Sequence, residues 1–302
     1  MSVQPVRPLI FGEVLFDHFP DGTSVLGGAP FNVAWHLQAF GLSPLLISRI
    51  GNDAAGQQVR ASMLQWGMDV SGLQYDEIHP TGRVEVSFEH GEPHYDIVEQ
   101  CAYDFIDAGE LPDLAETRWL LYHGSLALRQ ATSAQALAHI RQLTGAAQFL
   151  DINLRRPWWS RALLQPLLQQ ARWIKLNSDE LQQLLPETGN EEARIAAVLQ
   201  HKPDYFLLTR GAQGATAICA DGARYTVQAG KKANLIDTVG AGDAFCSVLI
   251  AGLVHRWPVP LTLSRAQAFA SEIVGIRGAT AANREFYQNM IALWQQEDVQ
   301  NV

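Results

Sequence analysis

Short apolar runs alternate with longer helical stretches through most of this chain, and this alternation limits the possible folds more than any other feature. The runs predicted as strands are 9–11, 45–50, 119–122, 148–152, 173–176 and 205–209. Between them, apolar residues such as Leu137, Ile140 and Leu143 recur at the spacing of a helix that packs along one face. Strands that alternate with helices form a mostly parallel sheet that is covered on both faces. The pattern therefore predicts an α/β fold.

Two helices are bounded by residues that favour helix ends. Pro30 is expected in the first turn of a helix that ends near Gly41. Asp53 is expected to cap the start of the next helix, and Gly67 lies just beyond its last apolar residue. Both helices are thus predicted from local signals.

Residues 81–98 do not follow the alternation of strands and helices. Apolar and polar residues alternate here, a turn follows at residues 90–93, and Tyr95 and Ile97 continue the alternation on the far side. This pattern is typical of an antiparallel hairpin with one solvent-exposed face. Residues 13–26 are expected to add a pair of strands beside it. We interpret both segments as a lid or dimerisation surface inserted in one domain that spans 1–302. An ordinary edge hairpin is the alternative.

Composition excludes several classes of protein. The 302 residues are 47% hydrophobic and 18% charged, as in a globular chain with a full core. A net charge of -9 argues against nucleic acid as a partner, because phosphate backbones are bound by clustered Lys and Arg. Three separated cysteines indicate neither a disulfide framework nor a zinc site. No signal peptide or membrane span of roughly 20 apolar residues is evident, so a cytoplasmic location is expected.

The stretch 237–245 carries the clearest chemical signal. Gly240 and Gly242 allow backbone angles that other residues avoid, and they leave space for a ligand. Helical spacing follows at Phe245, Val248, Leu249 and Gly252. Free amides at the start of that helix, with its dipole, would hold a phosphate. A carboxylate would repel a bound phosphate, so the presence of Asp243 here is explained if it acts as a base. This indicates phosphoryl transfer to a hydroxyl. Capping of the helix is its alternative role.

A second motif, at residues 27–34, reads Gly-Gly-Ala-Pro-Phe-Asn-Val-Ala. It resembles the N-terminal signature of ribokinase-like (PfkB-type) carbohydrate kinases, and 237–245 resembles their C-terminal signature about two hundred residues later. The resemblance spans nearly the whole chain. It implies a three-layer α/β sandwich with a mostly parallel sheet, a small antiparallel β lid, and phosphorylation of sugars or nucleosides by ATP with Mg²⁺. The phosphate-loop motif of other ATPases is absent, as this resemblance requires.

The resemblance assigns roles around the second signature. Asp243 becomes the base that takes the proton of the attacking hydroxyl. The amides that hold the transferred phosphoryl group belong to Gly240, Ala241 and Gly242. Asp237 and the carbonyl of Val239 correspond to ligands of a monovalent cation. The segment 275–279 is similar to the family's adenine and cation loop but is one residue shorter, which leaves activation by K⁺ open.

Sugar-binding residues are implied by the first signature. Asp17 and Asn32 resemble the family's ligands to sugar hydroxyls, and Gly27 and Gly28 would let the backbone approach the sugar. Arg155 lies in a run that is similar to a family segment near the sugar or its new phosphate. A turn carboxylate, a polar residue at a helix start and a structural salt bridge are the respective alternatives for Asp17, Asn32 and Arg155.

Nucleotide-binding residues are implied further along the chain. Asn177 and Glu180 match the family's Asn-x-x-Glu element near magnesium and phosphate, although this spacing is also that of a capping box. Thr209, Gly211 and Gly214 belong to a stretch that resembles a nucleotide-contacting loop at a strand end.

The choice of sugar depends on one departure from ribokinase. Ala29 stands where ribokinase carries Lys, and the Ala-Pro version resembles fructokinases. We therefore expect an ATP-dependent sugar kinase that acts on fructose. Kinases of 2-keto-3-deoxygluconate, ribose or nucleosides remain alternatives within the family. A catalytically weak sugar-binding regulator is the alternative outside it. A homodimer through the β lid is also expected.

Overall fold

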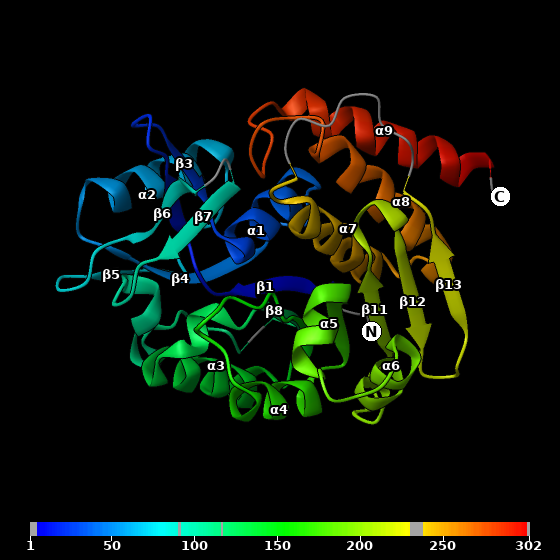
Figure 1. The fold of residues 1–302 in the computed structure, drawn as a ribbon. Coiled ribbons are helices and arrows are strands. Elements are labelled where there is room, and N and C mark those ends of the chain that lie inside the picture. Colours follow the sequence, from blue (N-terminus) through cyan, green and yellow to red (C-terminus); the bar gives the residue numbers. More distant parts are fainter. Residues whose placement is uncertain (1–4, 90–91, 116, 230–237, 301–302) are drawn as a thin grey trace. The chain divides into compact units, whose positions relative to one another are not determined.

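The computed structural model describes residues 5–89, 92–115, 117–229 and 238–300. Contacts between residues divide the chain into two compact units, and Figure 1 traces the elements of both. Unit one comprises Met1–Ala34, Ser43–Ala147 and Asn153–Ser160. Unit two comprises Trp35–Leu42, Gln148–Ile152 and Arg161–Val302.

Four parallel strands form the larger sheet region of unit one. In spatial order they are β8 (Trp119–His123), β1 (Arg7–Phe11), β4 (Leu45–Gly51) and β5 (Leu73–Asp76). Leu9 lies opposite Leu121 on one side and Leu45 on the other. Successive residues of β1 are buried, so both faces of this strand are covered, as parallel sheets require. The predicted strands at 9–11, 45–50 and 119–122 are confirmed.

Two of the helices in this half of the chain have ends that the sequence predicted. The α-helices are α1 (Ala29–Ala39), α2 (Ala54–Trp66) and α3 (Ala131–Thr144), and short 3-10 helices lie at Ala102–Phe105, Ala108–Glu110 and Leu126–Arg129. Pro30 lies in the first turn of α1. The Asp53 side chain accepts a 2.7 Å hydrogen bond from the amide of Gly56, and Gly67 ends α2 with φ of 80°. Both predicted caps of α2 are confirmed.

A second, smaller sheet in unit one has the strand order β3 (Ser24–Gly27), β2 (Leu15–His18), β6 (Gly82–Glu89) and β7 (Glu92–Ile97). The strands fall within the expected segments 13–26 and 81–98, except that β3 runs one residue further, to Gly27. Each segment forms an antiparallel hairpin, but β2 and β6 pair in parallel, with Leu15 opposite Gly82. The expectation of an antiparallel lid is therefore corrected at this one pairing. A hairpin turn forces antiparallel strands, whereas the long connection from β2 to β6 does not.

Unit two carries the second half of the parallel pattern. Its strands, in spatial order, are β9 (Ala147–Asp151), β10 (Trp173–Asn177), β11 (Tyr205–Thr209), β12 (Ala215–Cys219) and β13 (Arg224–Val227). The first three run parallel and the last two are antiparallel additions. Phe206, Leu207 and Leu208 are all buried, so helices cover both faces of β11.

Six helices are described in unit two beyond the end of α1. They are α4 (Arg161–Gln170), α5 (Ser178–Leu184), α6 (Glu191–Leu199), α7 (Ala241–His255), α8 (Val259–Ile273) and α9 (Arg284–Gln300), with a 3-10 turn at Gly211–Gln213. Helix α7 packs along α8, and nine consecutive residues of α7 are buried. In the described part of the chain, no helix combines the length and apolarity needed to cross a bilayer.

Candidate active site

The carboxyl ends of three neighbouring parallel strands meet at one edge of the unit-two sheet. Strand β9 ends at Asp151, β10 at Asn177 and β11 at Thr209, and Asn177 lies directly opposite Thr209. This edge of an open α/β sheet is where ligands usually bind. Thr209 also donates a weak 3.5 Å hydrogen bond to the carbonyl of Leu176, which ties β11 to β10.

The glycine-rich loop opens α7, as the sequence predicted. Gly240 precedes the helix in the left-handed region, with φ of 78° and no side-chain cap. A Cβ on Gly240 would overlap the backbone of Ala279, so glycine is required by both conformation and space. The first amides of a helix have no intrahelical acceptor. A helix of fifteen residues thus presents its amides and positive dipole end at this loop.

Asp243 is the third residue of α7 and is partly buried. It lies one helical turn before Cys246 and therefore on the same face of the helix. The carboxyl is therefore placed in the first turn of α7, beside the glycine-rich loop.

The Asn177–Glu180 element forms the capping box that its spacing also predicted. The Asn177 side chain accepts a 2.8 Å hydrogen bond from the Glu180 amide, and a Glu180 carboxylate oxygen accepts a 2.8 Å bond from the Asn177 amide. Glu180 is buried by this arrangement. The two residues fix the start of α5 at the strand-end edge, and any role toward magnesium would be added to this structural one.

Sequence reasoning missed a buried ion pair below the loop. Lys175 on β10 donates from Nζ to both carboxylate oxygens of Asp151 on β9, at 2.9 and 3.2 Å. Burial opposes the ammonium form, but the carboxylates of Asp151 and Glu180 outweigh it and raise the pKa of Lys175 above its ordinary value. The available signal was a lysine inside an otherwise apolar strand, since a buried charge requires a partner.

Cys246 completes this cluster. Its thiol donates to Oδ2 of Asp151 at 3.2 Å. Burial, reinforced by the charge of Asp151, raises the pKa of the thiol well above its ordinary value. The group therefore stays protonated, as a buried thiol does that packs rather than reacts.

In unit one, the structure brings three of the expected sugar-binding residues together. A Cβ built on Gly27 would lie 3.6 Å from the Asp17 carboxylate and 3.9 Å from Oδ1 of Asn32. Gly28 has φ of 103°, and a Cβ there would lie 2.7 Å from the carbonyl of Glu13. The two glycines thus let the chain pass closely between β2 and α1, with one carboxylate and one amide at the same place.

Arg155 lies near this group. Its guanidinium donates to the carbonyl of Leu154 at 3.1 Å, and its charge acts on Asp17. A role near the sugar and a structural role toward Asp17 both stay predictions for this residue.

We expect Asp17 to make sugar binding depend on pH. Burial raises the pKa of its carboxyl from 3.8 to about 6, against the opposing charges of Arg155 and His18. The ionised carboxylate is the stronger acceptor for hydroxyl groups. The KM for the sugar should therefore rise about tenfold between pH 7 and pH 5, while the KM for ATP changes little.

The control for this prediction is Asp17→Asn, whose sugar KM should be flat over the same range. Stability gives a second check. The folded protein keeps this proton up to about pH 6, whereas the unfolded chain releases it near 3.8. The contribution of Asp17 to stability is therefore full below 3.8 and is lost as pH rises through 6. A wild-type sugar KM that stays constant from pH 7 to pH 5 would show that Asp17 does not bind the sugar.

The structure shows less about the other residues that the sequence predicted for the site. Asp237 lies outside the described residues. Val239 is exposed and immediately precedes the loop. Gly211 and Gly214 follow β11 with φ of 53° and 89°, and a side chain on Gly214 would overlap the backbone of Val227. This turn therefore requires glycine for structure, whatever its contact with a nucleotide.

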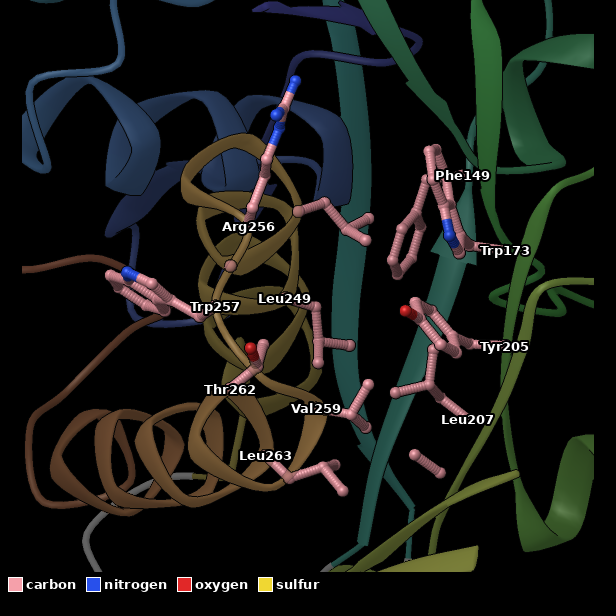
Figure 2. A pocket seen from close by; sticks show the side chains of 13 residues that line it. Phe149, Trp173, Tyr205, Leu207, Leu249, Arg256, Trp257, Val259, Thr262 and Leu263 are labelled. Atoms are coloured by element: carbon pink, nitrogen blue, oxygen red, sulfur yellow. The ribbon is translucent and has the colours of Figure 1, made fainter. Parts of the chain in front are cut away.

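A cavity of about 240 Å³ also lies in unit two, between α7, α8 and the sheet. Figure 2 shows Phe149, Trp173 and Tyr205 on the strand side and Leu249 and other apolar side chains on the helix side. Trp173 and Tyr205 are the first residues of β10 and β11, so the cavity lies at the opposite ends of the strands from Asn177 and Thr209. None of the expected site residues lines it. We therefore do not regard it as the active site.

Comparison with known proteins identifies the family to which this chain belongs. The model of the pfkB family of carbohydrate kinases matches residues 8–285, and the chain belongs to this family. A fructokinase of Escherichia coli is 31% identical over 259 residues, which cover 81% of this chain and 83% of that protein. A fructokinase of Salmonella typhimurium is 30% identical over 290 residues, which cover 90% and 92% of the two chains.

A solved structure extends the likeness to three dimensions. The fructokinase of Vibrio cholerae O395, crystallised with fructose, ADP and a calcium ion, is 25% identical and superposes with a TM-score of 0.81. The match covers 94% of this chain and 98% of that one. The predicted α/β ribokinase-like fold and the assignment as a sugar kinase are confirmed.

Proposed function

We propose that this kinase transfers the γ-phosphoryl group of ATP to a primary hydroxyl of fructose. The fructokinase relatives and the Ala29–Pro30 version of the first signature support this substrate. The observation that carries the proposal is the start of α7, where Gly240 and Gly242 open a long buried helix and Asp243 follows directly.

In this proposal Asp243 accepts the proton of the attacking hydroxyl. The amides of Ala241 and Gly242, at the positive end of the helix dipole, hold the charge that spreads over the transferred phosphoryl group. Preorganised donors of this kind contribute about 3 kcal/mol each to lowering a barrier. Val239 and Asp237 are proposed for a monovalent cation such as K⁺.

The sugar is assigned to the group in unit one. Fructose offers many hydroxyls and no charge, and Asp17 and Asn32 supply short polar groups that suit it. Gly27 and Gly28 leave the space for its approach, and Arg155 is proposed to lie near the sugar or its new phosphate.

ATP and Mg²⁺ are assigned to the strand-end edge of unit two. Asn177, Glu180, Thr209, Gly211 and Gly214 are proposed to contact the nucleotide region. In the described residues, no three His, Cys, Asp or Glu side chains converge on a metal site. Mg²⁺ keeps several waters and is held largely by substrate phosphates. Bound Mg²⁺ would neutralise phosphate charge during transfer.

An ADP-release assay over fructose, ribose, tagatose, 2-keto-3-deoxygluconate and nucleosides tests the proposal. We expect the highest kcat/KM with fructose. Turnover on none of these compounds, together with sugar binding by calorimetry, would instead establish a binding regulator.

Assembly and location remain predictions. We propose a homodimer through the small sheet and a cytoplasmic location, with no nucleic-acid or membrane partner. Light scattering coupled to gel filtration tests the dimer.

A further inference from the structure

A buried ion pair lies directly beneath the phosphate-binding loop. The Lys175 and Asp151 side chains are 7% and 1% exposed, and Nζ lies 2.9 Å from Oδ1 of Asp151. A Cβ built on Gly242, the second residue of α7, would lie 3.4 Å from that same Nζ. The ammonium therefore lies at the edge of the space that a side chain on Gly242 would occupy, and the next residue along the helix is Asp243.

Stability alone does not explain this pair. Two charges removed from water lose their hydration, and replacement of a buried pair by apolar side chains of similar volume is often neutral or stabilising. Asp151 is the last residue of β9, and Lys175 lies opposite it in the middle of β10, two residues before Asn177 at the end of that strand. The position of the pair thus points to a role in the site.

The local charges indicate what that role is. Asp151, Glu180 and Asp243 bring three carboxylates to this end of the sheet, and a nucleotide phosphate would add more negative charge. Among the described residues of this cluster, Lys175 supplies the positive charge. The Cys246 thiol donates to Asp151, which leaves that carboxylate bonded on both sides and its position fixed.

We propose that Lys175 is a positioning residue for phosphoryl transfer. Asp151, held in turn by the Cys246 thiol, keeps the ammonium below Gly242, where it offsets the negative charge of the phosphoryl group and of Asp243. This inference rests on the proposed function and adds a residue outside both family signatures. Lys175 acts through the loop and takes no proton from the sugar.

The double variant Lys175→Met with Asp151→Leu tests the proposal. Each single variant leaves one buried charge unpaired and should lower the melting temperature by about 10 °C. The double variant removes both charges, so its melting temperature should return to within a few degrees of wild type. Its kcat should remain about a hundredfold below wild type, with the sugar KM within about twofold.

A second buried pair supplies the matched control. Arg129 and Asp104 in unit one pair at 2.7 Å, with side chains 4% and 0% exposed. Arg129→Met with Asp104→Leu removes an equally buried pair that is not placed in the loop. Its kcat should stay within about threefold of wild type. If the Lys175/Asp151 double variant also keeps kcat within that range, the pair is structural and the proposal is wrong.

Nucleotide binding separates this inference from the proposed function. Calorimetry with the non-hydrolysable analogue AMP-PNP and Mg²⁺ should show about tenfold weaker binding by the double variant, whether or not any sugar is turned over. Failure of wild type to phosphorylate any sugar would overturn the proposed function alone. Equal AMP-PNP affinity of wild type and double variant would overturn the role of Lys175.

Discussion

Asp243→Asn is expected to reduce kcat for sugar phosphorylation by about a thousandfold or more, within the range of general-base effects. The amide has nearly the same shape but cannot accept the proton of the hydroxyl at neutral pH. Because the loop amides and the helix dipole remain, binding of ATP should be retained. A coupled ADP-release assay measures kcat, and calorimetry measures the nucleotide affinity.

Asp179→Asn is the matched control for this variant. Asp179 is an exposed acidic residue in the first turn of α5, so it also interacts with a helix dipole near the same edge of the sheet. Its replacement removes the same charge and should leave kcat within about twofold of wild type. A wild-type kcat in Asp243→Asn would show that another group is the base.

Gly240→Ala is the second change with a large expected effect. The new Cβ would overlap the backbone of Ala279 and would also occupy the left-handed region at φ of 78°. The loop must therefore shift, which moves the amides of Ala241 and Gly242. A displacement of about 1 Å can reduce turnover about a hundredfold. We expect that loss in kcat, with stability lowered by about 1–3 kcal/mol.

Gly145→Ala is the control that separates the effect of backbone strain from the effect of moving the glycine-rich loop. Gly145 ends α3 with φ of 57°, and a Cβ there would meet no atom within 4 Å. It should lose stability by about 1 kcal/mol and keep its activity. Chemical denaturation and steady-state kinetics of both variants make the comparison. Equal kcat values for Gly240→Ala and wild type would contradict the assigned role of the loop.

The parts of the fold that local chemistry determines could be predicted from the sequence. Asp53 and Gly67 bound α2 because capping and the left-handed conformation depend on a few neighbouring residues. The parallel strands were evident because burial on both faces requires continuous apolar runs such as Phe206–Leu208. Asn177 and Glu180 also interact within one helical turn, so their capping box followed from spacing.

Features that depend on distant parts of the chain were harder to predict. The Lys175–Asp151 pair exists because β9 and β10 are neighbours in the sheet, which no local pattern specifies. The parallel pairing of β2 with β6 likewise joins segments far apart in the chain. Asp17, Gly27 and Asn32 were named from the family resemblance, whereas their convergence required the structure.

Phosphorus NMR of wild-type protein with ATP, Mg²⁺ and fructose tests the central claim most directly, because it identifies the product as well as the loss of ATP. We predict that the γ-phosphate signal declines while a phosphate-monoester signal of the sugar and the β-phosphate signal of ADP grow in equal amounts. The same mixture with Asp243→Asn should stay nearly unchanged over that time. A γ-phosphate signal that persists in the wild-type sample, or that is converted to inorganic phosphate alone, would contradict the assignment.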